Sequence, residues 1–111
     1  MAAHAIRVER IQGPVMVIVG EDDHVWPAAE LTGFAVRRLR EHGFAHRVEL
    51  LSYPDAGHFL GWPNVAIPTS RSRHRVSGEE MDRGGSAEGT AHARQDAWPR
   101  MLAFLRDSLA A

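Results

Sequence analysis

Two short apolar runs flank an amphipathic segment in the first half of the chain. Residues 14–19 form a continuous run rich in β-branched residues, with glycine on either side. Such a run is typical of a strand that is covered on both faces, as in a parallel sheet. A second strand is expected over residues 47–53, where Val48, Leu50 and Leu51 are apolar and Pro54 follows.

The segment between these strands has helical spacing. Over residues 27–42, Leu31 and Leu39 fall on one face, Pro27 suits the first turn and Gly43 supplies a stop. Strand, helix and strand in this order predict a βαβ unit, whose crossover is almost always right-handed.

The last third of the chain predicts a long loop and then a helix. Residues 61–89 are poor in periodicity and rich in Gly, Ser and Arg, which favours a loop with at most a short helix. A helix is expected over about 90–109. Its apolar stripe is expected to form core and comprises Trp98, Met101, Leu102, Leu105 and Leu109. Pro99 predicts either a kink or a new start near Asp96 as cap.

These elements predict an α/β fold, the C-terminal part of a doubly wound sheet. A chain of 111 residues with two strands and two helices leaves sheet edges uncovered and the core thin. We therefore expect residues 1–111 to be a single partial domain, with its missing part N-terminal to Pro14. The partner at the open edge would be that missing half, or a second copy in a homodimer.

Composition narrows the classes of function. Apolar residues make up 44% and charged residues 24%, the net charge is −1, and cysteine is absent. Absence of cysteine excludes disulfides and thiolate chemistry within this chain. The small net charge provides no overall electrostatic attraction for nucleic acid. No stretch approaches the about 18 apolar residues of a membrane helix. The N-terminus lacks the pattern of a secretory leader, so a cytoplasmic location is expected.

Candidate chemistry follows the ends of the two expected strands. Asp23 lies three residues past Gly20, and His58 lies in the loop after the second strand. In open α/β sheets ligands bind outside the carboxyl ends of strands, so these loops share one edge. An aspartate there can accept a hydrogen bond from the imidazole and stabilise its protonated form. Taken singly, an Asp or a His in such a loop is more often a turn or loop residue than a catalytic one. The two residues together favour a catalytic role.

For the other candidate patterns, a structural role is at least as good an interpretation as a functional one. His42 and His46 have the spacing of two helical metal ligands, but Gly43 is expected to end the helix between them. The basic run at 71–75 could contact the phosphates of coenzyme A or nucleic acid, but acidic residues follow at once, which favours a solvated loop. Residues 22–24 cannot easily converge on one ion. We expect no metal, no cofactor and no nucleic acid partner.

Three strings together resemble one enzyme family. They are Gly-Glu-Asp-Asp-His-Val-Trp at 20–26, Tyr-Pro-Asp-Ala-Gly-His at 53–58, and Gly84-Gly85 followed by Gln-Asp-Ala-Trp at 95–98. With them the chain is similar to the C-terminal domain of the acyl-CoA thioesterase and bile acid-CoA:amino acid N-acyltransferase family, whose members are α/β-hydrolases. The resemblance extends from about Val8 to Leu109.

The resemblance implies roles for individual residues. His58 matches the catalytic histidine, and Asp23 matches the triad acid, because such hydrolases place the acid three residues after the glycine ending the strand. Trp26 matches a motif position and is expected to pack against the following helix. The implied substrate of the complete enzyme is an acyl-CoA or another thioester.

The chain departs from the family at the nucleophile. The family's Ser or Cys lies in a Gly-x-Ser-x-Gly or Gly-x-Cys-x-Gly elbow upstream of the acid, and no Ser or Cys precedes Asp23 here. The nearest imitation surrounds Ser86; it lacks the closing glycine and follows the histidine.

Two functions are therefore expected. One is the acid- and histidine-bearing portion of a thioester hydrolase or acyltransferase, inactive alone, with its nucleophile on another segment. The alternative is a non-catalytic remnant or an edge-pairing interaction module.

Overall fold

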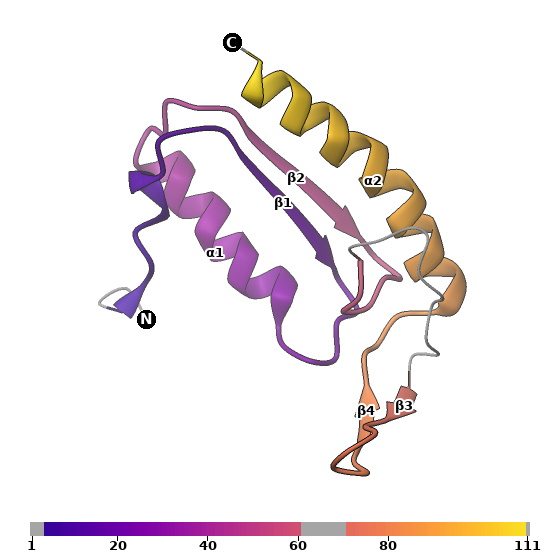
Figure 1. Ribbon diagram of the computed structural model, residues 1–111. Helices are drawn as coiled ribbons and strands as arrows, with labels where there is room; N and C mark the ends of the chain where they lie inside the picture. Colours follow the sequence, from indigo (N-terminus) through magenta and orange to yellow (C-terminus); the bar gives the residue numbers. More distant parts are fainter. Residues whose placement is uncertain (1–3, 61–70, 111) are drawn as a thin grey trace.

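The computed structural model describes residues 4–60 and 71–110, and its centre is a parallel strand pair. Strand β1 (Val15–Gly20) pairs with β2 (Val48–Tyr53), with Val15 opposite Val48 and Gly20 opposite Tyr53. Helix α1 (Ala28–Glu41) connects the strands, and α2 (Ala87–Leu109) ends the fold. The two helices lie on opposite sides of the strand pair (Figure 1). The expected α/β class, strands and connecting helix are confirmed.

Helix α1 ends where the sequence predicts. His42 is its C-cap, and the following Gly43 has a φ of 60°. The N–H of Phe44 then returns to the carbonyl of Leu39 at 3.0 Å, which satisfies a carbonyl of the last turn. At the same end, a short 3₁₀ helix (Val8–Arg10) is tied to the last turn of α1 by an ion pair from Glu9 to Arg38 at 2.6 Å.

The buried core lies between the strand pair and α2. In a parallel pair, opposed residues point to the same face, so Leu51 and Tyr53 project with Ile18 toward α2. There they pack with Ala56, Ala93 and Ala97, and with Met16 and Leu60 at the margin. Small alanines on the helix allow the backbone of α2 to approach the sheet closely.

The apolar stripe predicted to form core on α2 is not its buried face. The buried residues of the helix are Thr90, Ala93, Arg94, Ala97 and Phe104. Leu102, Leu105 and Leu109 keep exposed fractions of 41%, 43% and 79%. The prediction that this stripe is core is wrong for this chain, because nothing in the described residues covers that side of the helix.

The start of α2 contradicts one of the two alternatives for Pro99, a new helix beginning near Asp96. The helix begins at Ala87, with Ser86 as N-cap, and it continues through Pro99. Asp96 is therefore inside the helix rather than a cap. Its carboxylate accepts a hydrogen bond from the Tyr53 hydroxyl at 2.7 Å and ties the end of β2 to α2.

The long loop expected over 61–89 is only partly a loop. Residues 61–70 lie outside the described residues. Beyond them, β3 (Arg71–Arg73) and β4 (Glu80–Asp82) form an antiparallel hairpin, and α2 has begun by residue 87. The two strands of this hairpin are three residues long and charged at most positions. They therefore show little of the alternation of apolar and polar residues that predicts strands.

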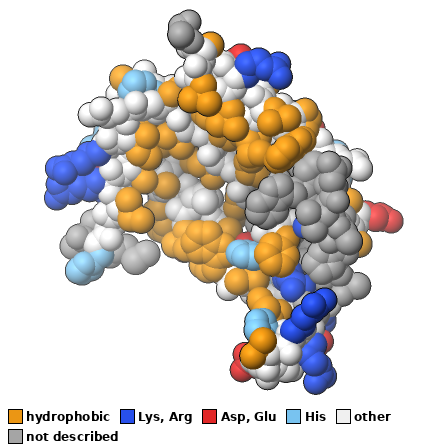
Figure 2. All heavy atoms as spheres, viewed as in Figure 1, with side chains coloured by type: hydrophobic (Ala, Val, Ile, Leu, Met, Phe, Trp, Pro, Cys, Tyr) orange, Lys and Arg blue, Asp and Glu red, His pale blue; other side chains and the backbone are white. Residues whose placement is uncertain are grey.

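The molecule is more open than a compact domain of its length. Its Cα radius of gyration is 15.7 Å, against about 13 Å expected for this chain length. Its accessible surface is 7875 Å², against about 6,100 Å² for a compact monomer of this mass. Figure 2 shows hydrophobic side chains gathered around a hollow between α1 and α2. Within the described residues, no helix is long and apolar enough to cross a membrane.

Candidate functional site

The carboxyl ends of β1 and β2 bring Asp23 and His58 together. His58 Nδ1 lies 2.9 Å from Asp23 Oδ2, although the residues are 35 positions apart. The Asp23 side chain is 5% exposed and the His58 side chain 31% exposed. The register that sets Gly20 opposite Tyr53 places the two following loops side by side and so produces this contact.

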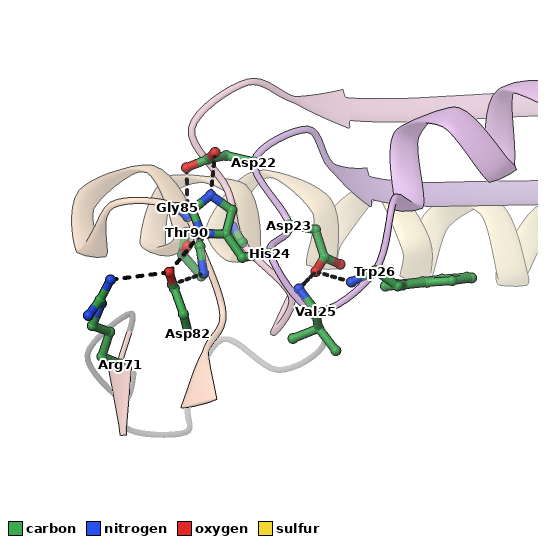
Figure 3. A network of polar contacts seen from close by, with 11 residues as sticks. Asp22, Asp23, His24, Val25, Trp26, Arg71, Asp82, Gly85 and Thr90 are labelled. Atoms are coloured by element: carbon green, nitrogen blue, oxygen red, sulfur yellow. Dashed lines mark hydrogen bonds and ion pairs between the residues drawn. The ribbon is translucent and has the colours of Figure 1, made fainter. Parts of the chain in front are cut away.

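The loop that carries Asp23 fixes the orientation of its carboxylate. Asp23 Oδ1 accepts hydrogen bonds from the backbone N–H of Val25 at 2.8 Å and of Trp26 at 3.4 Å (Figure 3). The other carboxylate oxygen of Asp23, Oδ2, therefore remains available to His58. Because the carboxylate accepts from three donors, its negative charge is stabilised although it is nearly buried.

The other ring nitrogen of His58 faces no partner among the described residues. No hydrogen bond to Nε2 is present in residues 4–60 or 71–110. His58 lines a cavity of about 290 Å³ between β1, the start of α1 and α2. Apolar walls come from Ile18, Trp98 and Met101. A histidine that donates at Nδ1 and keeps Nε2 open beside a cavity is arranged to exchange a proton there.

Trp26 and Trp98 both border the cavity. Trp26, expected to pack against α1, is 47% exposed and lines the cavity together with Ala28 and Thr32 of that helix. Trp98, expected to be core, is half-buried and forms another part of the wall.

A third loop, to which the sequence assigned no role beyond the motif glycines Gly84 and Gly85, joins the two that carry Asp23 and His58. The carbonyl of Arg83 accepts the backbone N–H of His58 at 3.0 Å and that of His24 at 3.4 Å. Gly84 pairs with Asp23 as an isolated antiparallel bridge. We name residues 82–85 the spacer segment, because it lies between the acid loop and the histidine loop.

The two glycines of the spacer segment are required by its conformation and its packing. Gly84 and Gly85 have φ values of 73° and 69°. A Cβ on Gly84 would overlap the carbonyl oxygen of Asp22, and one on Gly57 would overlap the carbonyl of Gly84. The adjacent glycines were the available signal for this segment, because consecutive glycines mark positive φ or close backbone approach.

His24 sits between two carboxylates beside this segment. Its Nδ1 lies 2.9 Å from Asp82 Oδ2, and its Nε2 lies 3.0 Å from Asp22 Oδ1 (Figure 3). The hydrogen bond to Asp82, and then that to Asp22, raises the pKa of His24. The same contact with His24 is the largest cause that lowers the pKa of Asp82.

The side chain of Arg83 packs on the residue after His58. Its guanidinium carbon lies 4.8 Å from the centre of the Phe59 ring. Within the described part of the chain, Nε and Nη1 are buried and have no hydrogen-bond partner. The stacking on Phe59 offsets part of their desolvation.

The remaining candidate signals have structural roles. His42 Nδ1 bonds the carbonyl of Arg38, while His46 packs on Phe44 with ring centres 5.3 Å apart. The basic run at 71–75 begins in β3 and continues beyond it, and Arg71 faces the carboxylates of Glu80 and Asp82 on β4 at 3.9 and 3.7 Å. Among the described residues, no group of three or more His, Asp or Glu is arranged to hold a metal ion.

Ser86 serves as a helix cap rather than as a partner of His58. Its hydroxyl oxygen accepts the N–H of Gly89 at 2.9 Å. In the described residues, no serine hydroxyl is hydrogen-bonded to His58.

A family model decides what the chain is related to. The model described as "BAAT / Acyl-CoA thioester hydrolase C terminal" matches residues 2–111. The chain belongs to this family. The resemblance inferred from the sequence is confirmed, and the α/β fold of the chain agrees with the C-terminal part of an α/β-hydrolase.

Members of this thioesterase family are among its curated relatives. The chain is 35% identical over 104 residues to acyl-coenzyme A thioesterase 6 of Mus musculus, covering 94% of this chain and 24% of the relative. It is 34% identical over 99 residues to the peroxisomal succinyl-coenzyme A thioesterase of Mus musculus, covering 89% and 23%. It is 31% identical over 104 residues to human acyl-coenzyme A thioesterase 1, covering 94% and 24%. The chain thus spans about a quarter of the length of these relatives.

Proposed function

We propose that this chain supplies the acid and the base of an acyl-CoA thioester hydrolase, with Asp23 as the acid and His58 as the base. The observation that carries the proposal is the 2.9 Å contact between His58 Nδ1 and Asp23 Oδ2. Asp23 then holds the neutral imidazole with its proton on Nδ1, and Nε2 is free to accept a proton beside the cavity.

The nucleophile would be a Ser or Cys on a polypeptide segment outside this chain. His58 Nε2 takes its proton as the oxygen or sulfur attacks the thioester carbonyl. The carbon–sulfur bond to coenzyme A breaks, and the leaving thiolate takes the proton back from the imidazolium. Water hydrolyses the acyl-enzyme with His58 again as base, or an amine takes the acyl group in a transferase.

The open side of β1 is the proposed docking place for that segment. The cavity lies along this strand, between α1 and α2, and Leu102 and Leu105 are exposed beside it. The accessible surface exceeds the expected value by about 1,800 Å². This excess is about twice the roughly 800 Å² that each partner buries in a standard protein interface. Residues 1–111 would then be one partial domain.

The substrate class is proposed from the relatives. They are named acyl-coenzyme A thioesterases, one of them a succinyl-coenzyme A thioesterase. We propose an acyl-CoA thioester as substrate and leave its acyl chain unassigned, because most of the acyl pocket would come from the missing segment. The proposed location stays cytoplasmic, although two of the relatives carry peroxisomal and mitochondrial in their names.

A chimera tests the proposal. This chain replaces the matching C-terminal quarter of mouse acyl-coenzyme A thioesterase 6, and release of free coenzyme A thiol is followed. We expect hydrolysis that falls about 10⁶-fold in His58→Ala and about 10⁴-fold in Asp23→Asn, as for other triads. His42→Ala is the control, because His42 bonds the carbonyl of Arg38 and faces Glu9, and neither His42 nor Glu9 lines the cavity. A His58→Ala chimera as active as the control would show that His58 is not the base.

The second candidate is a non-catalytic module that pairs through the open edge. The exposure of Leu102 and Leu105 favours it as a self-associating form. In that case the midpoint of thermal unfolding should rise with protein concentration, because folding and association are coupled. A monomer with a concentration-independent midpoint would contradict this candidate.

A further inference from the structure

We propose that His24 is a positioning residue, which in its doubly protonated form holds the spacer segment against the acid loop and so maintains the contact between Asp23 and His58. The inference rests on the proposed function, because it concerns the same pair. It concerns a residue that touches neither Asp23 nor His58 through its side chain.

The geometry of the His24 ring requires both ring nitrogens to donate. Each nitrogen lies about 3 Å from a carboxylate oxygen, Asp82 Oδ2 on one side and Asp22 Oδ1 on the other. A neutral imidazole has one N–H and one lone pair, so one of these contacts would set a lone pair against a carboxylate. Only the imidazolium satisfies both contacts. The side chain of His24 is 47% exposed, so protons reach it freely.

The two carboxylates also hold the backbone of the spacer segment. Asp22 Oδ2 accepts the N–H of Gly85 at 2.9 Å, and Asp82 Oδ1 accepts the N–H of Gly84 at 2.9 Å. His24, Asp22, Gly85, Gly84 and Asp82 therefore close a ring of polar contacts (Figure 3). In this ring the imidazolium joins a carboxylate of the acid loop to a carboxylate of β4.

The ring is connected to the proposed catalytic pair through the backbone. The carbonyl of Arg83 accepts the N–H of His58, and Gly84 bridges to Asp23. Any shift of the spacer segment therefore changes the spacing between the acid loop and the histidine loop. A contact of 2.9 Å tolerates little such movement before the hydrogen bond weakens.

Charged groups around His24 set the direction of its pH response. Asp22 comes from its own loop and Asp82 from β4. Arg71 of β3 lies 3.7 Å from the Asp82 oxygen that also faces His24. The pKa of His24 is raised, so its contribution is complete below the ordinary value of about 6.5 and is lost as the pH rises through the higher folded value. Above that pH Arg71 still pairs with Asp82. His24, which then has a single N–H, has lost its hydrogen bond to one of the two carboxylates.

The test uses nuclear magnetic resonance of the 111-residue chain. The readout is the solvent exchange rate of the His58 Nδ1 proton, compared between wild type and His24→Ala at the same pH. We expect exchange about tenfold faster in the variant at pH 6, for a loss of about 1.4 kcal/mol. The two rates should converge to within twofold once the ring resonances of wild-type His24 show that it is neutral.

The pH dependence separates positioning from a merely structural role. A ratio of rates that stays constant through the titration of His24 would overturn the proposal, as would a ratio within twofold at pH 6. His42→Ala is the matched control, because its side chain is 45% exposed and His42 lies on α1. It should leave the exchange rate unchanged.

A second variant covers the case in which His24→Ala does not fold. Asp82→Asn keeps an oxygen for the N–H of Gly84 and removes the charge that faces His24. The titration midpoint of His24 should fall, and the loss of protection at His58 should move to lower pH with it. If the midpoint falls and the protection does not follow, His24 does not position the pair. The proposed function is judged separately, by His58→Ala in the chimera.

Discussion

At the carboxyl ends of β1 and β2, polar groups from three loops bond one another, whereas on the C-terminal half of α2 apolar side chains remain in solvent. Asp23 accepts three hydrogen bonds while only 5% of its side chain is exposed. In the C-terminal half of α2, Leu102 and Leu105 are more than 40% exposed. The polar edge is thus held together by contacts among the described residues, whereas part of the apolar surface of α2 is left uncovered by them.

This difference follows from how the two regions are built. The polar edge depends on backbone turns and on contacts between loops that all lie within residues 20–60 and 80–90. The apolar side depends on layers packed against both sides of a helix, which requires more polypeptide than two strands and two helices supply. The contact between Asp23 and His58, the proposed acid–base pair, therefore does not depend on covering the exposed face of α2.

The largest expected effect is in the spacer segment. Gly84→Ala should cost about 4 kcal/mol or more of unfolding free energy, because its Cβ would overlap the backbone of Asp22 at a positive φ. Gly78 has the same φ of 73° and open space around it, so Gly78→Ala should cost only about 1 kcal/mol. Denaturant unfolding measures both. Equal costs would mean that the segment is not closely packed between the loops.

The second effect concerns two neighbours on α2. Phe104 is 7% exposed, and Phe104→Ala should cost about 3 kcal/mol in the isolated chain. Leu105 is 43% exposed, and Leu105→Ala should change stability by less than about 0.5 kcal/mol. Comparable losses at both positions would show that Leu105 is already covered, for instance by a second copy.

The third effect is expected only when the upstream segment is present. Leu105→Asp should leave the isolated chain nearly unchanged and should destabilise the chimera by about 2 kcal/mol or more, because a carboxylate would be buried without a partner. Thermal unfolding of both proteins measures the difference. If the chimera tolerates Leu105→Asp as well as the isolated chain does, this face of α2 remains open in the complete enzyme.

The smallest effect is at the end of β2. Tyr53→Phe removes the bond to Asp96 and should cost about 1 kcal/mol. Burial, and then the bond to Asp96, raises the pKa of Tyr53 to about 12. The folded state therefore holds this proton more tightly, and its stability should fall as the pH rises from about 10 through 12. A wild-type protein with the same alkaline stability profile as Tyr53→Phe would contradict this.

Much of the fold was predictable from local patterns. The β-branched run at 14–19, the helical spacing after Pro27 and the stop at Gly43 each act within one element, and each gave an element within a few residues of its observed bounds. The proximity of the loops carrying Asp23 and His58 followed from the rule that parallel strands end at one edge.

Other features depend on contacts between distant segments, which the pattern of apolar and polar residues along the chain does not record. The buried face of α2 is set by alanines that let it approach the sheet, while its leucine stripe belongs to a surface this chain does not cover. The strands of the hairpin at 71–82 are too short and too highly charged to show the alternation of apolar and polar positions that is typical of strands. The spacer segment lies about 25 residues after His58, and only its two glycines hinted at close packing.

The most direct test of the proposed acid–base pair is the tautomer of neutral His58 in the folded chain. Two-bond nitrogen–proton spectra above the titration of His58 report which ring nitrogen carries the proton. The account predicts the Nδ1–H form, held by Asp23, and its loss in Asp23→Ala. A neutral His58 with its proton on Nε2 could not accept a proton from a nucleophile there, and that result would contradict the account.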